Sequence, residues 1–206
     1  MPRLLPLPSV DPPGPPPARL RRPRRGPLRA VLAPALAVAA LAAALLAGCG
    51  EAPLDPPPPG FERVDHVADG DTVILRGGVT VRLVQIDTPE VFFRPECFGA
   101  EASAEAKRLL PRGTLVRLVA EPATEPVDQF GRLLRYVVRD DGVDVNLALV
   151  ADGFAAPYFF EGRRGDRARV IERLAEAARR DGAGLWGACP GTPYKPTEGV
   201  GTGPPP

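Results

Sequence analysis

The stretch VADGDTVILRGGVTVRLVQIDTPE, residues 67–90, decides the fold of this 206-residue chain. Two apolar or alternating runs, 73–75 and 79–86, flank Arg76-Gly77-Gly78. The paired glycines suit a tight turn because glycine readily adopts positive φ. The stretch therefore predicts two strands joined as a hairpin.

Segments further along the chain return to strand and helix compositions. Residues 114–120 and 132–139 are rich in β-branched, aromatic and leucine residues, which predicts strands. Helices are predicted at 101–110, 143–151 and 167–180. About five strands with about three helices inserted late predict an α+β fold, a five-stranded OB-fold-like β-barrel packed against the helices.

The N-terminal part has the order of a secretion signal. Residues 1–29 are rich in Pro and Arg, and residues 30–47 are apolar apart from Pro34. The sequence Leu46-Ala47-Gly48-Cys49 comes next and resembles the lipobox of bacterial lipoproteins, in which the Cys is lipidated and becomes the mature N-terminus. We therefore expect residues 1–48 to be a lipoprotein signal peptide and Cys49 to carry a lipid anchor.

A plain transmembrane helix is the alternative for the apolar segment, since eighteen apolar residues can just span a bilayer. In both cases the preceding arginines favour a cytoplasmic start and export of the residues beyond the apolar segment. The expected location is therefore extracytoplasmic, either lipid-anchored to the cell membrane or secreted.

Composition divides the rest of the chain into three parts. Residues 49–60 contain four successive prolines, which predict an extended spacer behind the anchor. Residues 61–189 form the predicted domain. Residues 190–206 are mostly Gly, Pro and Thr with few apolar side chains, so we expect a disordered tail.

The charge of the exported part differs from that of the whole chain, which is +1. Residues 1–48 contain seven Arg and one Asp, so their removal leaves nineteen basic and twenty-four acidic side chains, a net charge of −5. A protein with this balance does not attract polyanions by its overall field. Binding of nucleic acid would need a local basic patch or a bound cation.

Two cysteines remain once Cys49 is assigned to the lipid. In an oxidising compartment Cys97 and Cys189 are expected to form a disulfide, with two free buried thiols as the alternative. Neither has the spacing of a metal ligand, and His66 is the single histidine, which argues against a zinc site and against chemistry built on a catalytic histidine.

Five side chains suggest phosphodiester chemistry. Asp71 and Asp87 lie at the start of one predicted strand and the end of its partner, where their hard oxygen atoms would suit Ca²⁺. Glu90 is close enough in sequence to act on a water beside that cation as a general base. Arg82 and Arg132 offer planar sets of donors to a phosphate.

Three blocks carry a family resemblance: VADGDTVILR at 67–76, VRLVQIDTPE at 81–90 and DQFGRLLR at 128–135. In order and spacing they resemble the active-site blocks of the staphylococcal nuclease (thermonuclease) family, and the likeness extends over residues 62–189. The resemblance implies a calcium-dependent endonuclease. Such an enzyme hydrolyses DNA and RNA to 3′-phosphorylated nucleotides and oligonucleotides.

The resemblance also implies a role for each residue that matches the family motifs. It gives the calcium ligands as Asp71, Asp87 and the Thr88 backbone carbonyl, the phosphate-binding residues as Arg82 and Arg132, and the general base as Glu90. The chain departs from the family at Gln129-Phe130, where Lys-Tyr is common. Phe130, Tyr158 and Phe159 are candidate nucleotide contacts, either by stacking on a base or by packing on the barrel.

Two other interpretations compete with the enzyme. A non-catalytic nucleic-acid-binding lipoprotein module could be built on the same barrel. A lipoprotein with a structural role, stabilised by calcium, would leave Arg82, Arg132 and Glu90 unexplained. The expected partners are DNA and RNA as substrates and the membrane through the lipid on Cys49, and the sequence indicates no protein partner.

Overall fold

The computed structural model describes residues 55–205. The predicted signal peptide, Cys49 and the first part of the spacer lie outside these residues. Among the described residues, no helix is both long enough and apolar enough to cross a membrane. The strands are β1 (Glu62–Val67), β2 (Thr72–Leu75), β3 (Thr80–Leu83), β4 (Ile86–Asp87), β5 (Leu115–Ala120), β6 (Leu133–Arg139) and β7 (Ala156–Pro157).

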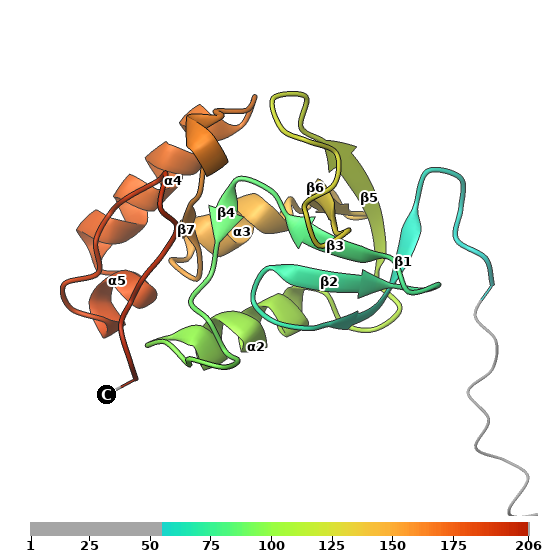
Figure 1. Cartoon of the computed structure of the whole chain (residues 1–206). Coiled ribbons are helices and arrows are strands. Elements are labelled where there is room, and N and C mark those ends of the chain that lie inside the picture. The colour runs from blue at the N-terminus through green and yellow to red at the C-terminus, as the bar shows by residue number, and fades with distance from the viewer. Residues whose placement is uncertain (1–54, 206) are drawn as a thin grey trace, which may run out of the picture. The chain divides into compact units, whose positions relative to one another are not determined.

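Five of the strands close into a barrel in the order β1-β2-β3-β6-β5, as Figure 1 shows. β3 and β6 are parallel, and the other neighbouring pairs are antiparallel. The β2–β3 hairpin turns at Gly77 and Gly78, both with positive φ, as their place in the sequence predicted. The predicted five-stranded OB-fold-like barrel is confirmed.

The helices are α2 (Gly99–Leu109), α3 (Val145–Ala151), α4 (Ala168–Asp181) and α5 (Leu185–Ala188), with a short 3-10 helix, η1 (Phe160–Gly162). α3 packs against β6 and lies between α2 and α4. Its N-terminus is capped by Asp144, whose side chain accepts a hydrogen bond from the Leu147 amide. α4 buries residues at helical spacing, among them Ile171 and Ala175, so it covers the core with one apolar stripe.

One predicted strand is interrupted. The run 79–86 was expected to be continuous, but β3 ends at Leu83 and the chain turns at Gln85, which has a φ of 65°. The buried Gln85 side chain stabilises this turn by donating to the Arg163 carbonyl and accepting from the Gly165 amide. After the turn, β4 pairs with β7, and Asp87 faces back toward the start of β2.

The C-terminal segment differs from its prediction of disorder. Residues 190–205 are packed on the domain after the Cys97–Cys189 disulfide. Tyr194 packs against Trp186 and under the guanidinium of Arg179. Composition suggested disorder because apolar residues are few, but this segment is held by backbone hydrogen bonds, by the hydroxyls of Thr192 and Thr202 and by the packing of Tyr194.

Candidate active site

One half of the site is a buried cluster of Asp71, Arg82 and Asp87. Asp71 directly precedes β2, and the β2–β3 pairing places the next residue, Thr72, opposite Arg82. Nη2 of Arg82 lies 2.9 Å from Asp71 Oδ2 and 2.6 Å from Asp87 Oδ1. Its Nη1 donates to the carbonyls of Leu83 and Ile86, so the same guanidinium also holds the turn that returns Asp87.

Thr88 completes the surroundings of Asp71. Its backbone amide and its hydroxyl both donate to Asp71 Oδ2, at 3.0 and 3.2 Å. Gly70 permits this approach, because a Cβ at that position would lie 2.4 Å from Thr88 Oγ1. Oδ2 of Asp71 therefore faces Arg82 and accepts two hydrogen bonds from Thr88, while Oδ1 accepts from the Thr72 hydroxyl.

Among the described residues, Asp71 and the partly buried Asp87 pair with the same cation, Arg82. Burial raises the pKa of Asp71 to about 6 even though Arg82 opposes the shift, and the neighbouring Asp87 adds to it. Burial likewise raises the pKa of Asp87, against the effects of Arg82 and of a hydrogen bond from the Val200 amide. The cluster carries a net negative charge that a divalent cation would compensate.

The other half of the site is a tight turn built around Asp128. Its Oδ1 accepts from the amides of Phe130 and Arg132, both at 2.9 Å, and its Oδ2 accepts from Arg132 Nε at 2.6 Å. Burial alone would raise the pKa of Asp128, but these hydrogen bonds outweigh burial and lower the pKa. Only Nε of Arg132 takes part in this ion pair, so its two terminal nitrogens point beyond it.

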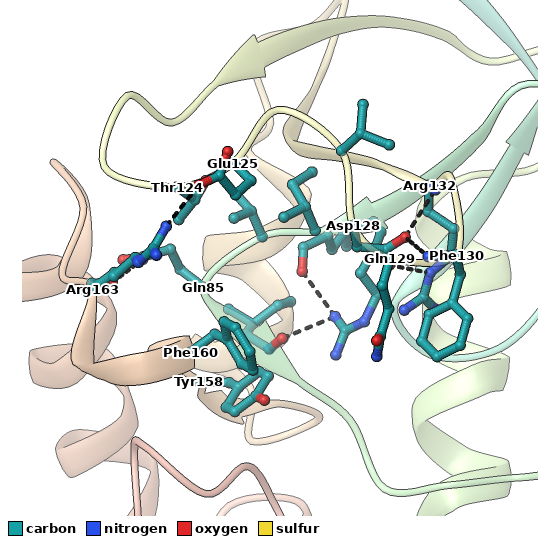
Figure 2. Close-up of a pocket in the computed structure, with 16 residues that line it drawn as sticks. Gln85, Thr124, Glu125, Asp128, Gln129, Phe130, Arg132, Tyr158, Phe160 and Arg163 are labelled. Atoms are coloured by element: carbon teal, nitrogen blue, oxygen red, sulfur yellow. Dashed lines mark hydrogen bonds and ion pairs between the residues drawn. The ribbon is translucent and has the colours of Figure 1, made fainter.

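The parallel pairing of β3 with β6 brings the two halves together, because Val81 lies opposite Leu133 and Arg82 opposite Leu134. Arg82 and Arg132 consequently line one cavity of about 360 Å³. Figure 2 shows Asp128, Arg132 and the exposed ring of Phe130 on one side of this cavity.

Two aromatic side chains form the other side. Tyr158 and Phe160 line the cavity with their rings 6.3 Å apart, edge to face, whereas Phe159 is fully buried in the core (Figure 2). Phe159, which was predicted as a nucleotide contact, is thus shielded from the cavity, whereas Phe160 lines it. Tyr158 follows β7 directly and Phe160 begins η1, and the two rings meet at the cavity while Phe159 between them points into the core.

Glu90, the candidate base, is exposed and lies on the loop after Asp87. The loop is closed by mutual hydrogen bonds, since the Glu90 amide donates to the Glu96 carboxylate and the Glu96 amide donates to the Glu90 carbonyl. Partial burial and the carboxylates of Asp71 and Asp69 raise the pKa of Glu90. Glu90 therefore lies in the electric field of the buried cluster.

The oxygen atoms of the buried cluster fit a calcium ion. Asp71 and Asp87 present carboxylate oxygens to one cationic nitrogen, and Ca²⁺ takes oxygen ligands from carboxylates, carbonyls, water and phosphate. In residues 55–205 no group of three or more His, Cys, Asp or Glu side chains could hold a metal. A calcium ion here would complete its shell with non-protein oxygens or backbone carbonyls.

Sequence reasoning overlooked two further residues at the cavity. Arg163 lines it while paired with Glu125 and Glu161, at 3.1 and 2.9 Å. Gln129 also lines it, and had been noted only as a departure from the family pattern. No sequence motif identifies Arg163, because the path of the chain after β7 and η1 is what brings it to the cavity.

A family model described as staphylococcal nuclease homologue matches residues 80–188. The chain belongs to the staphylococcal nuclease family. It is 32% identical to endonuclease YhcR of Bacillus subtilis over 149 residues, which cover 64% of this chain and 12% of YhcR. It is 34% identical to the thermonuclease of Staphylococcus intermedius, over 60% of this chain and 74% of that protein.

The chain is also 32% identical to an uncharacterized endonuclease of Escherichia coli O157:H7, over 60% of this chain and 75% of that protein. The matched region of this chain thus spans about three quarters of two of these relatives and a small part of the third. The residues that the family model matches, 80–188, include Arg82, Asp87, Glu90 and Arg132. Asp71 lies before them.

Proposed function

We propose that this staphylococcal nuclease family member is a calcium-dependent endonuclease that hydrolyses DNA and RNA to 3′-phosphorylated products. The observation that carries the proposal is the shared cavity, where Arg82 and Arg132 lie together beside the buried pair Asp71 and Asp87. The printed names of the relatives, endonuclease and thermonuclease, support the same class of reaction.

Each side chain has a place in the proposed hydrolysis. Glu90 accepts a proton from water as the water oxygen attacks phosphorus and the bond from phosphorus to the 5′ oxygen breaks. That oxygen takes a proton and leaves as a hydroxyl, so the phosphate stays on the 3′ side. Arg82 and Arg132 donate to the phosphate oxygens and stabilise their growing negative charge.

Asp71, Asp87 and the Thr88 carbonyl would hold the calcium ion. Calcium, when bound, would give the two carboxylates a positive charge of the kind that Arg82 supplies in this structure. Tyr158 and Phe160 would stack on or pack beside a base at the far side of the cavity.

The test is hydrolysis of single-stranded DNA by residues 51–206, in calcium and in EDTA. Residues 54–206 form one compact unit, so this fragment keeps the whole domain. We expect calcium-dependent cleavage that leaves 3′-phosphate ends, reduced at least a hundredfold in both Glu90→Ser and Arg132→Ala. Binding of calcium and DNA without any cleavage would instead favour a non-catalytic module.

We further propose that residues 1–48 are removed as a lipoprotein signal peptide, that lipid on Cys49 anchors the protein outside the cytoplasm, and that residues 49–60 form a spacer. The support is the order of the basic, apolar and Leu46-Ala47-Gly48-Cys49 segments. The intact mass of the protein extracted from the membrane fraction tests this. A chain that begins at a lipid-modified Cys49 supports the anchor, and a chain that still contains residues 1–48 favours the transmembrane alternative.

A further inference from the structure

Residues 196–203, here called the C-terminal strap, cross the Asp87 side of the candidate active site. In Figure 1 the dark red trace leaves α5, runs beside α4 and β7 and ends near the start of α2. The strap begins where the Pro196 carbonyl accepts from the Phe159 amide. It ends where the Gly203 carbonyl accepts from the Cys97 amide at 2.8 Å.

Both ends of the strap are fixed on the domain. Upstream, the Cys97–Cys189 disulfide and the packing of Tyr194 on Trp186 set the path of the chain. Downstream, Thr202 Oγ1 donates to the Cys97 carbonyl at 2.7 Å, beside the bond made by Gly203. The segment between these points has little freedom to leave Asp87.

The middle of the strap contacts the carboxylate of Asp87 directly. The Val200 amide donates to Asp87 Oδ2 at 2.9 Å, while Oδ1 faces Arg82. Gly199 makes this approach possible: its φ is +82°, and a Cβ there would lie 2.7 Å from Asp87 Oδ2. The two oxygens of Asp87 are thus held by different partners.

The strap leaves the cavity open. None of its residues lines the cavity that contains Arg82, Arg132 and Tyr158. The strap therefore contacts Asp87 without lining the cavity that would hold the nucleotide. This position is suited to orienting the carboxylate of Asp87 and not to blocking the cavity against substrate.

We propose that the strap is a built-in part of the calcium site, in which the Val200 amide positions Asp87 so that Oδ1 is presented to the cation. Hydrogen bonds that orient a metal ligand commonly change metal affinity by about tenfold to a hundredfold when they are lost. Val200 acts through Asp87, so it is a positioning residue. The inference rests on the proposed function, because it assumes that Asp87 binds calcium.

The experiment measures calcium binding to the full chain by titration calorimetry, without nucleic acid. Val200→Pro removes the amide hydrogen, and Val200→Ala keeps it while shortening the side chain. A second pair tests the whole strap: one chain lacks residues 197–206, and its control lacks only 204–206. The melting temperature of each chain in EDTA reports any purely structural effect.

We expect the calcium Kd to rise at least tenfold in Val200→Pro and in the chain without residues 197–206, and to stay within about twofold in both controls. Unchanged or tighter calcium binding in these two variants would overturn the proposal, whether or not their melting temperatures fall. A lack of calcium binding by the unaltered chain would overturn both this inference and the calcium dependence of the proposed function. Calcium binding without DNA cleavage would count against the enzyme alone, and the strap would still be judged on the Kd values.

Discussion

Arg82 and Arg132 line the same cavity, but their surroundings differ. The Arg82 side chain is 12% exposed and serves two carboxylates, whose side chains are 9% and 22% exposed. The Arg132 side chain is 29% exposed and, within residues 55–205, its carboxylate partner is Asp128. The first cluster is left with an excess negative charge, whereas the second is neutral.

This difference separates two roles that one residue type can have at a phosphate site. Arg82 compensates buried charge and holds the turn from Leu83 to Ile86, so fold and chemistry both depend on it. Arg132 is held by a local turn, so chemistry depends on it far more than the fold does. Substitutions that separate activity from stability test this comparison.

Arg82→Ala should have the largest effect. It leaves Asp71 and Asp87 buried without their cation, which should lower the free energy of unfolding by about 3–5 kcal/mol in EDTA and should also abolish most cleavage. Urea unfolding in EDTA measures the first effect. Arg132→Ala is the matched control and should cost less than about 1 kcal/mol. Equal losses of stability in the two variants would contradict the comparison.

Arg132→Ala should lower kcat/KM by about a hundredfold to a thousandfold, since it removes donors that stabilise charge in the transition state. Asp128→Asn should cause a smaller loss, of about tenfold, because Arg132 stays charged but loses the ion pair that orients it. Steady-state cleavage of a short single-stranded oligonucleotide measures both. If Asp128→Asn lost as much activity as Arg132→Ala, the turn would do more than position the arginine.

The pH dependence of stability without calcium should reflect the buried cluster. The pKa of Asp71 is raised to about 6 in the folded chain from an ordinary 3.8. Between about pH 4 and pH 6, the folded chain therefore keeps a proton on Asp71 that the unfolded chain has lost. As a result, the free energy of unfolding falls as pH rises from about 4 to 6. The size of this change is on the order of 1–3 kcal/mol.

Urea unfolding in EDTA at pH 5 and pH 7.5 checks this sign, with Asp71→Asn as the control that should respond less. Asp128 does not mask the effect, because its pKa is lowered and its contribution is lost only as pH falls below about 4. A wild-type chain that gains stability between pH 5 and 7.5 would show that Arg82 outweighs burial in setting the protonation of Asp71.

Much of the barrel and the polar part of the site can be predicted from local sequence signals. The hairpin signal around Gly77-Gly78 predicts that Asp71 lies near Arg82, and the β2–β3 pairing places the adjacent Thr72 opposite Arg82. The helices α2, α3 and α4 fall within about two residues of their predicted ranges. These features are predictable because hydrophobic periodicity, glycine turns and helix caps act over a few residues.

The parts that were not predicted depend on contacts between distant segments. Phe160 lines the cavity and Phe159 is buried because β7 ends at Pro157 after pairing with β4 and the chain then enters η1 at Phe160. The strap packs through amide groups such as that of Val200, which residue composition does not reveal. Val84 and Gln85 were included in one strand, yet Gln85 turns the chain through contacts with Gly165, eighty residues away.

Phe130 should give the smallest effect and sharpens the comparison at the exposed arginine. Its ring is 73% exposed and lies 5.4 Å from the guanidinium carbon of Arg132, so it supports Arg132 mainly through a cation–π contact. Such contacts contribute about 0.5–1 kcal/mol at exposed sites, so Phe130→Ala should raise KM about twofold to fivefold with little change in stability. Phe130→Tyr keeps the ring and adds a hydroxyl that can donate to phosphate, so it should keep or lower KM. If both variants raised KM equally, the shape of Phe130 rather than its aromatic face would be what the site requires.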